Sequence, residues 1–319
     1  MKKSFFVLSL LLASCTQELD IPFPRGKEQL VLNSILHPDS TIKVSLTKTL
    51  PLSSTGSDFP VVDNAAIRMY EDNVLVGMPA YQDSIYILEY LPKAGKEYRI
   101  EVEVPGFQVL RASDMVPERP VAEICLRDDP VLRKVIDIKI IDQNDVLNTY
   151  WLGGVFINSR LRACGEGNTC NVIQPAFESF SSIPDRFNAN IDNVAGGISL
   201  FRYYVRIEDS KKSNNQIELV VLNFFFINPS DLLDDQSYRL DIKSASQHYD
   251  RFLKSSIIHA TNPSREYIEE ADVAIAPFAE IIQSYSNVEN GTGIFAAYNS
   301  VSFDVEDNPC RFVPVESDP

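Results

Sequence analysis

The sequence predicts a mainly β protein. We expect an N-terminal immunoglobulin-like β-sandwich, then a larger antiparallel β domain, sandwich or barrel-like, with one packed helix late in the chain. Short runs of alternating apolar and polar residues recur about every ten residues between turn-forming residues, a spacing typical of β-sandwiches. Over residues 246–258 the apolar period changes to that of a helix.

Residues 1–14 read as an export signal. Lys2 and Lys3 precede an uncharged, largely apolar run over residues 4–12, which is followed by Ala13, Ser14 and Cys15. These are the parts of a signal peptide, and the run is far shorter than the roughly 20 residues of a membrane-spanning helix. The cysteine directly after small residues resembles the bacterial lipobox. We therefore expect cleavage before Cys15 and a triacylated cysteine, palmitate included, that anchors the chain to a membrane. An unlipidated signal with an incidental cysteine is the alternative.

Residues 15–28 follow as the lipidated cysteine and its tether. Pro22, Pro24 and Gly26 favour an extended spacer there. The sandwich is then expected over residues 29–118. Its strands are predicted from alternating runs at residues 30–36, 42–46, 66–70, 74–76, 84–88 and 98–104.

Residues 119–319 are predicted to form the larger β-rich domain. Its candidate strands cover residues 135–142, 149–157, 200–207, 216–226, 238–243, 294–298 and 300–305. In the predicted helix, Tyr249, Phe252 and Leu253 recur at helical spacing, and Ser246 is suited to the N-cap. The irregular stretch 171–197 is the best candidate for a recognition loop, because long loops on β scaffolds often carry function. The ligand that it would bind is unknown.

Composition limits the partners. The chain has a net charge of −15 and 45% hydrophobic residues, enough for a sizeable core. Such acidity argues against nucleic acid as a partner. The most apolar later stretch, residues 217–227, is too short to span a membrane and contains Glu218 and Asn223.

Four cysteines remain after Cys15, an even number in an oxidising compartment. Cys164 and Cys170 flank a short polar loop with two glycines, which favours a disulfide between them. Pairing Cys125 with Cys310 would close the second half as one unit. Four cysteines allow three pairings, so this connectivity is a hypothesis. No CxxC or nearby histidine supplies a zinc set, and no metal is expected.

The segment SNVENGTGIFAAY at residues 286–298 resembles the signature of the domain of unknown function 4249 family. The helix before it and the PFAE segment at residues 277–280 fit the same pattern, although Ile281 replaces the usual second proline. The runs "VLNSIL" and "LPKAGKEYRIEVEVPG" extend the resemblance over nearly the whole mature chain. It implies an outer-membrane lipoprotein, often encoded beside TonB-dependent transporters, and it supplies no catalytic residues. The glycines at positions 291 and 293 predict a structural turn before a strand rather than a phosphate-binding loop.

Motifs for catalysis are lacking in the sequence. His37, His248 and His259 form no metal motif, and no nucleophile elbow or P-loop occurs, so we expect no enzyme and no cofactor. The leading hypothesis is a non-enzymatic accessory or substrate-binding component of a TonB-dependent nutrient transporter. It would be lipid-anchored at the outer membrane, facing the periplasm or the cell surface. A structural or adhesive surface protein is the alternative, and a hydrolase with a cryptic site is a third.

Overall fold

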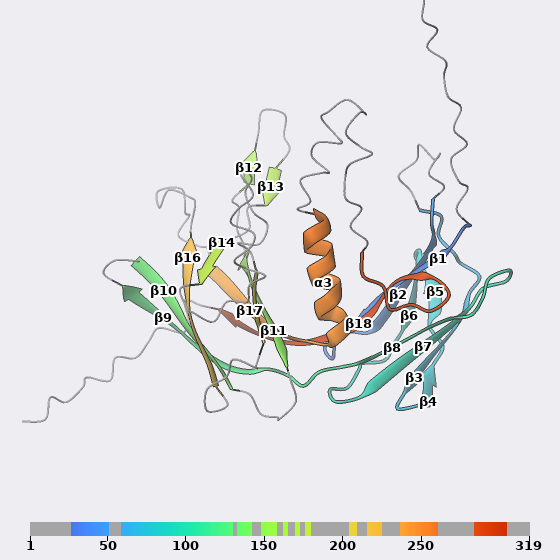
Figure 1. Cartoon of the computed structure of the whole chain (residues 1–319), viewed down its shortest axis with the longest axis horizontal. Helices are drawn as coiled ribbons and strands as arrows, with labels where there is room; N and C mark the ends of the chain where they lie inside the picture. The colour runs from blue at the N-terminus through green and yellow to red at the C-terminus, as the bar shows by residue number, and fades with distance from the viewer. Residues whose placement is uncertain are drawn as a thin grey trace, which may run out of the picture.

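The computed structural model describes residues 27–50, 59–129, 133–141, 148–157, 162–164, 170–172, 176–179, 204–208, 216–224, 237–260 and 284–304. The protein is mainly β, as predicted, and its strands form several open sheets in these ranges (Figure 1). The predicted signal peptide, Cys15 and most of stretch 171–197 lie outside the described residues. No helix in the described part of the chain is long and apolar enough to cross a membrane.

The first half of the chain contributes eight short strands. They are β1 (Leu30–Leu36), β2 (Ile42–Lys48), β3 (Ala66–Glu71), β4 (Val74–Gly77), β5 (Ala80–Gln82), β6 (Ile85–Leu88), β7 (Glu97–Glu103) and β8 (Leu110–Met115). In β7 the buried and exposed residues alternate, which is the pattern that predicted this strand. β5 and β8 were not predicted.

The second half contributes ten strands and one described helix. The strands are β9 (Val121–Asp129), β10 (Arg133–Ile141), β11 (Thr149–Ile157), β12 (Arg162–Cys164), β13 (Cys170–Val172), β14 (Ala176–Ser179), β15 (Tyr204–Glu208), β16 (Gln216–Phe224), β17 (Ser237–Ala245) and β18 (Thr292–Asp304). The helix α3 covers Gln247–Ala260. Its predicted N-cap is confirmed, because the Ser246 hydroxyl accepts a hydrogen bond from the Tyr249 N–H at 3.0 Å.

One eight-stranded sheet runs through the molecule in the order β15-β11-β17-β18-β1-β2-β6-β5. β18, from the end of the chain, pairs in parallel with β1, from Val31 opposite Thr292 to Leu36 opposite Ala297. The two predicted domains therefore share this sheet, although the predicted boundary at residues 118–119 stays a prediction. The immunoglobulin-like topology also stays a prediction.

A four-stranded sheet, β4-β3-β7-β8, packs on one part of the long sheet and completes the N-terminal sandwich. Ile67, Ile100 and Val102 from this sheet share a buried cluster with Leu32 and Phe295 from the long sheet. The β-sandwich is therefore closed by a residue of β18. Burial of this apolar area is its main source of stability.

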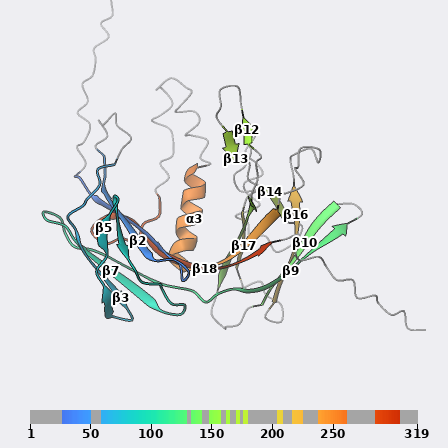
Figure 2. The same cartoon turned by 180° about the vertical axis from the view of Figure 1, so that it is seen from behind.

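A second four-stranded sheet, β14-β16-β10-β9, packs on another part of the long sheet. Ile136 and Ile138 of β10 share a buried cluster with Leu240 and Ile242 of β17, against which Phe303 of β18 packs. In β18, the odd-numbered residues face the two four-stranded sheets, and the even-numbered ones face α3. The helix thus covers the opposite face of the long sheet, as Figures 1 and 2 show from both sides.

The glycine-rich segment that leads into β18 is structural, as predicted, and its second glycine, Gly293, lies within the strand. Gly293 has φ +113°, and a Cβ at this position would lie 2.0 Å from the Leu32 carbonyl oxygen. Just before it, Asn287 bonds through its side-chain amide to both the N–H and the carbonyl of Phe295, at 3.0 and 2.7 Å. Glycine at position 293 therefore allows β18 to approach β1 closely.

Gly293→Ala is expected to lower the free energy of unfolding by at least about 3 kcal/mol, since backbone strain and a clash with Leu32 act together. Gly106→Ala is the matched control, because Gly106 also has a positive φ but no atom lies within 4 Å of its added Cβ. Its expected cost is about 1 kcal/mol. Chemical denaturation of both variants measures the difference, and equal costs would contradict the close approach at Gly293.

Candidate functional site

The predicted disulfide cysteines are only partly described. Cys125 is disulfide-bonded, and the side chains of the other three candidates, Cys164, Cys170 and Cys310, lie outside the described residues. Cys164 and Cys170 are directly opposite each other in the β12–β13 hairpin, a backbone register that suits a bridge. The pairings Cys164–Cys170 and Cys125–Cys310 stay predictions.

A row of polar side chains crosses the face of the long sheet that α3 covers. We call it the helix-side row: Arg206, Trp151, Lys243, Ser300, Tyr298 and His37. The first four lie in register on neighbouring strands, since Arg206 pairs with Trp151, Trp151 with Lys243, and Lys243 with Ser300. His37 follows β1 and reaches Ser300 from the other side.

Asp250 of α3 fastens the helix to this row. Its carboxylate accepts hydrogen bonds from Trp151 Nε1 at 2.9 Å and from Arg206 Nε and Nη2 at 2.6 and 2.8 Å. Burial raises the pKa of Asp250, but the hydrogen bonds and charge of Arg206 outweigh this effect and the net pKa lies below its ordinary value. Lys254 adds a contact at 3.2 Å. The buried arginine is thus a compensated structural charge.

Among the described residues, His37 and Ser300 come nearest to a hydrolase pair, but the ring proton lies on the nitrogen that faces the serine. The Asp39 N–H donates to His37 Nδ1 at 3.2 Å, which leaves the proton of the neutral ring on Nε2. Burial lowers the pKa of His37 and favours this neutral form. Nε2 therefore donates to Ser300 Oγ at 3.0 Å, whereas a nucleophilic serine must donate its proton to the histidine.

Tyr298 lies at the centre of the row and has its ring covered. Tyr249 stacks on it with 4.9 Å between ring centroids, His37 lies 4.8 Å away, and Lys243 Nζ is 5.0 Å from the centroid. Burial lowers the pKa of Lys243 and raises that of Tyr298. These contacts join α3 to the sheet and cover the ring, so Tyr298 is not an open stacking platform. Of the other histidines, His248 bonds to Tyr285, and the side chain of His259 lies outside the described residues.

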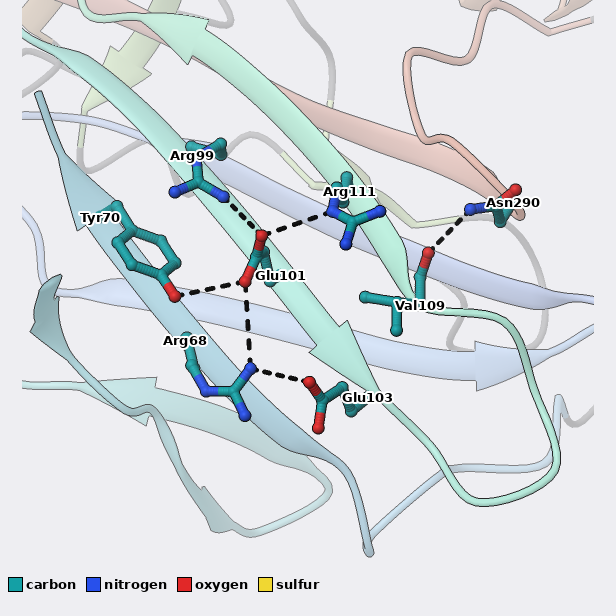
Figure 3. A network of polar contacts seen from close by, with 8 residues as sticks. All are labelled: Arg68, Tyr70, Arg99, Glu101, Glu103, Val109, Arg111 and Asn290. Carbon is teal, nitrogen blue, oxygen red and sulfur yellow. Dashed lines mark hydrogen bonds and ion pairs between the residues drawn. The ribbon is translucent and has the colours of Figure 1, made fainter. Parts of the chain in front are cut away.

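A second polar cluster lies on the outer face of the four-stranded sheet β4-β3-β7-β8, and Figure 3 shows it from close by. We call it the Glu101 network: Arg68, Tyr70, Arg99, Glu101, Glu103 and Arg111. The Glu101 carboxylate accepts hydrogen bonds from Tyr70 Oη at 3.2 Å, Arg99 Nη1 at 2.5 Å and Arg111 Nε at 3.4 Å. Sequence reasoning missed this network, although cross-strand register is what brings its members together.

The Glu101 network pairs three arginines with two glutamates, so most of its charge is compensated within the cluster. Burial raises the pKa of Glu101, but its arginine and tyrosine partners outweigh this and hold the net pKa below the ordinary value. Arg68 bonds Glu103 at 2.8 Å, and the Arg99 guanidinium stacks over the Tyr70 ring at 4.1 Å. The cluster is flat and open on the sheet surface. Such an arrangement suits contact with another surface rather than chemistry on a small molecule.

A buried carboxylate joins the sandwich to the helix. Asp114 of β8 is 8% exposed, and its Oδ2 bonds the Ser246 hydroxyl and accepts the Ala297 N–H at 2.8 Å. It thereby joins β8, the start of α3 and β18. Burial raises its pKa to about 7, although the hydrogen bonds from Ser246, Met115 and Ala297 act in the opposite direction.

Comparison with protein families identifies the family of the chain. A family model described as "Domain of unknown function (DUF4249)" matches residues 16–304. No curated protein matches the chain. The matched range begins directly after the predicted lipidation site and includes the helix-side row, the Glu101 network and Asp114.

The contribution of Asp114 to the stability of the protein is expected to fall as the pH rises from about 4 to about 7. Unfolded Asp114 ionises near its ordinary pKa of 3.8, whereas the folded protein keeps its proton up to about pH 7. The lost stability is at most about 4 kcal/mol. Asp114→Asn should flatten this part of the profile of unfolding free energy against pH. A variant that keeps the full slope would contradict the assignment to Asp114.

Arg206→Met is expected to destabilise the protein by about 3–5 kcal/mol, because Asp250 would lose its main buried counter-charge. The matched control is Arg239→Met, which breaks the half-exposed pair of Arg239 and Asp304 at 2.9 Å. Its expected cost is about 0–1 kcal/mol. Thermal unfolding compares the two variants, and similar losses would show that the buried pair does not hold α3.

Proposed function

The chain belongs to the DUF4249 family, and from this premise we propose that it is an outer-membrane lipoprotein anchored through Cys15. It acts as a non-enzymatic accessory or substrate-binding component of a TonB-dependent nutrient transporter. The observation that carries the proposal is the order of residues 2–15, in which two lysines, an apolar run and small residues precede a cysteine. The family match, which starts at residue 16, supports a mature chain that begins at Cys15.

The non-enzymatic part of the proposal rests on how the polar clusters are used. Within the described ranges, the helix-side row and the Glu101 network bind their own side chains to one another. The proton of neutral His37 lies on Nε2, which donates to Ser300, so this nitrogen does not accept the proton of a serine nucleophile. These arrangements favour a rigid body that makes contacts over one that activates a substrate.

One observation favours the alternative of a structural or adhesive surface protein. β4 and β5 are edge strands of their two sheets, and residues 74–82 between and within them carry no charge. Val74, Leu75, Met78 and Tyr81 are all exposed there, from 42% to 67%. Uncharged edges of this kind invite pairing with another chain.

Cys15→Ser is expected to abolish labelling with an alkyne fatty acid and to release the protein from the membrane fraction. Ser14→Ala, which keeps a small residue before the cysteine, is the control and should remain labelled. Persistent labelling of the Cys15→Ser chain would refute the anchor.

The transporter partner is tested separately, by purifying the acylated protein in mild detergent. We expect an outer-membrane barrel of the TonB-dependent class to co-purify in stable stoichiometry. Recovery of the acylated protein alone, from cells that express such transporters, would favour the adhesive alternative.

A further inference from the structure

The described body meets the tether at one end of the sandwich. We call this the tether end: Lys27, Lys48, Phe59, Val61 and Phe107. β1 begins at Leu30, which pairs with Lys48 at the end of β2. The Lys48 N–H donates to the carbonyl of Pro60 at 2.9 Å, so Phe59 lies beside the point where the tether joins the sheet.

Apolar side chains at the tether end are exposed to solvent. Phe59 is 56% exposed, and Val61, which pairs with Thr47 at the end of β2, is 44% exposed. The Lys48 ammonium lies 5.3 Å from the centroid of the Phe107 ring. Transfer of Phe59 and Val61 into water-free surroundings would be favourable, because it would remove their apolar surface from water.

The local charge is less negative than that of the whole chain. Lys27 and Lys48 are accompanied by Glu28, which forms an ion pair with Lys48 at 3.4 Å. Asp58 precedes Phe59 in the sequence, so these four residues sum to zero charge in a chain of net charge −15. Ammonium groups near apolar and aromatic side chains are the combination that membrane–water interfaces favour.

The tether keeps this end close to the lipid. Eleven residues separate Cys15 from Lys27, so the fully extended spacer reaches only about 40 Å. The anchor holds the body at this end, so the effective concentration of membrane surface around Phe59 and Val61 is high. A contact of low intrinsic affinity is then enough to keep this end on the membrane.

We propose that the tether end is the membrane-contacting face of the protein, with Phe59 and Val61 in the headgroup region and Lys27 and Lys48 at the lipid phosphates. The inference rests on the proposed lipid anchor at Cys15. It adds a second, non-covalent contact to the acyl chains and fixes which way the body faces.

The larger apolar edge at β4 and β5 provides a control at the other end of the sandwich. In the four-stranded sheet β4-β3-β7-β8, Ala66 at the start of β3 pairs with Glu103 near the tether end. β3 then leads to the opposite end at Glu71, which pairs with Val74. Figure 1 places the β3–β4 hairpin away from the start of β1. Val74 is 67% exposed, so it matches Phe59 in exposure but not in position.

The test uses the full acylated chain in vesicles of phosphatidylethanolamine and phosphatidylglycerol with brominated acyl chains, which quench nearby indoles. Phe59→Trp and Val61→Trp are compared with Val74→Trp. The native Trp151 is 2% exposed and contributes the same background to all three. We expect Phe59→Trp and Val61→Trp to shift their added emission to the blue and lose most of it, and Val74→Trp to change in neither respect.

Each outcome decides between the claims. Acylation is first checked from the mass of the N-terminal peptide. An unacylated peptide from wild-type cells refutes the proposed anchor, and the membrane face falls with it. If the peptide is acylated but Phe59→Trp is not quenched, or only Val74→Trp is quenched, the membrane face is wrong and the anchor stands.

Discussion

The architecture depends on one buried carboxylate. Asp114 stands at an inward position of β8, where its neighbours in the pattern, Leu110 and Ala112, are apolar. Its Oδ2 bonds the serine that caps α3 and also accepts the N–H of Ala297 in β18. The sandwich, the helix and the long sheet therefore meet at one oxygen atom. An apolar residue there would leave the Ser246 hydroxyl without its acceptor, and it would leave the Ala297 N–H only the longer hydrogen bond to Ser246 Oγ at 3.4 Å. Loss of a hydrogen bond is costly for buried polar groups.

The remaining polar interactions follow two different rules. On the helix side of the long sheet, Arg206 and Asp250 are buried and compensate each other, so either group alone would be costly. On the outer face of the sandwich, the three arginines around Glu101 are 33% to 50% exposed, and solvent weakens their ion pairs. The first set determines where the helix lies. The second leaves a flat polar face whose energetic contribution to folding is small.

Local pattern was enough to predict many of the elements. Alternation marked β1, β2 and β7, and the helical period with Ser246 marked α3. β8 was missed because Asp114 breaks its apolar pattern. The buried role of Arg206 was also out of reach, since an arginine in a strand usually faces solvent. A signal was present in the sequence, because residues 150–152 are consecutive aromatic and aliphatic residues, as in a strand covered on both faces, and both Trp151 and Leu152 are buried. Pairing between β1 and β18 joins distant residues and leaves no local pattern. Cys15 and the partners of the predicted disulfide pairings lie outside the part of the chain that the structure describes.

The parallel pairing of β1 with β18 has a consequence for biogenesis. β18 fills the gap between β1 and β17 and supplies Phe295 to the first core, and it is synthesised long after β1. The N-terminal core cannot be completed on the emerging chain, because its closing strand does not yet exist. Such high contact order slows folding. Until β18 is made, the apolar strands of the N-terminal core stay exposed, and such exposure favours self-association of the unfinished fold.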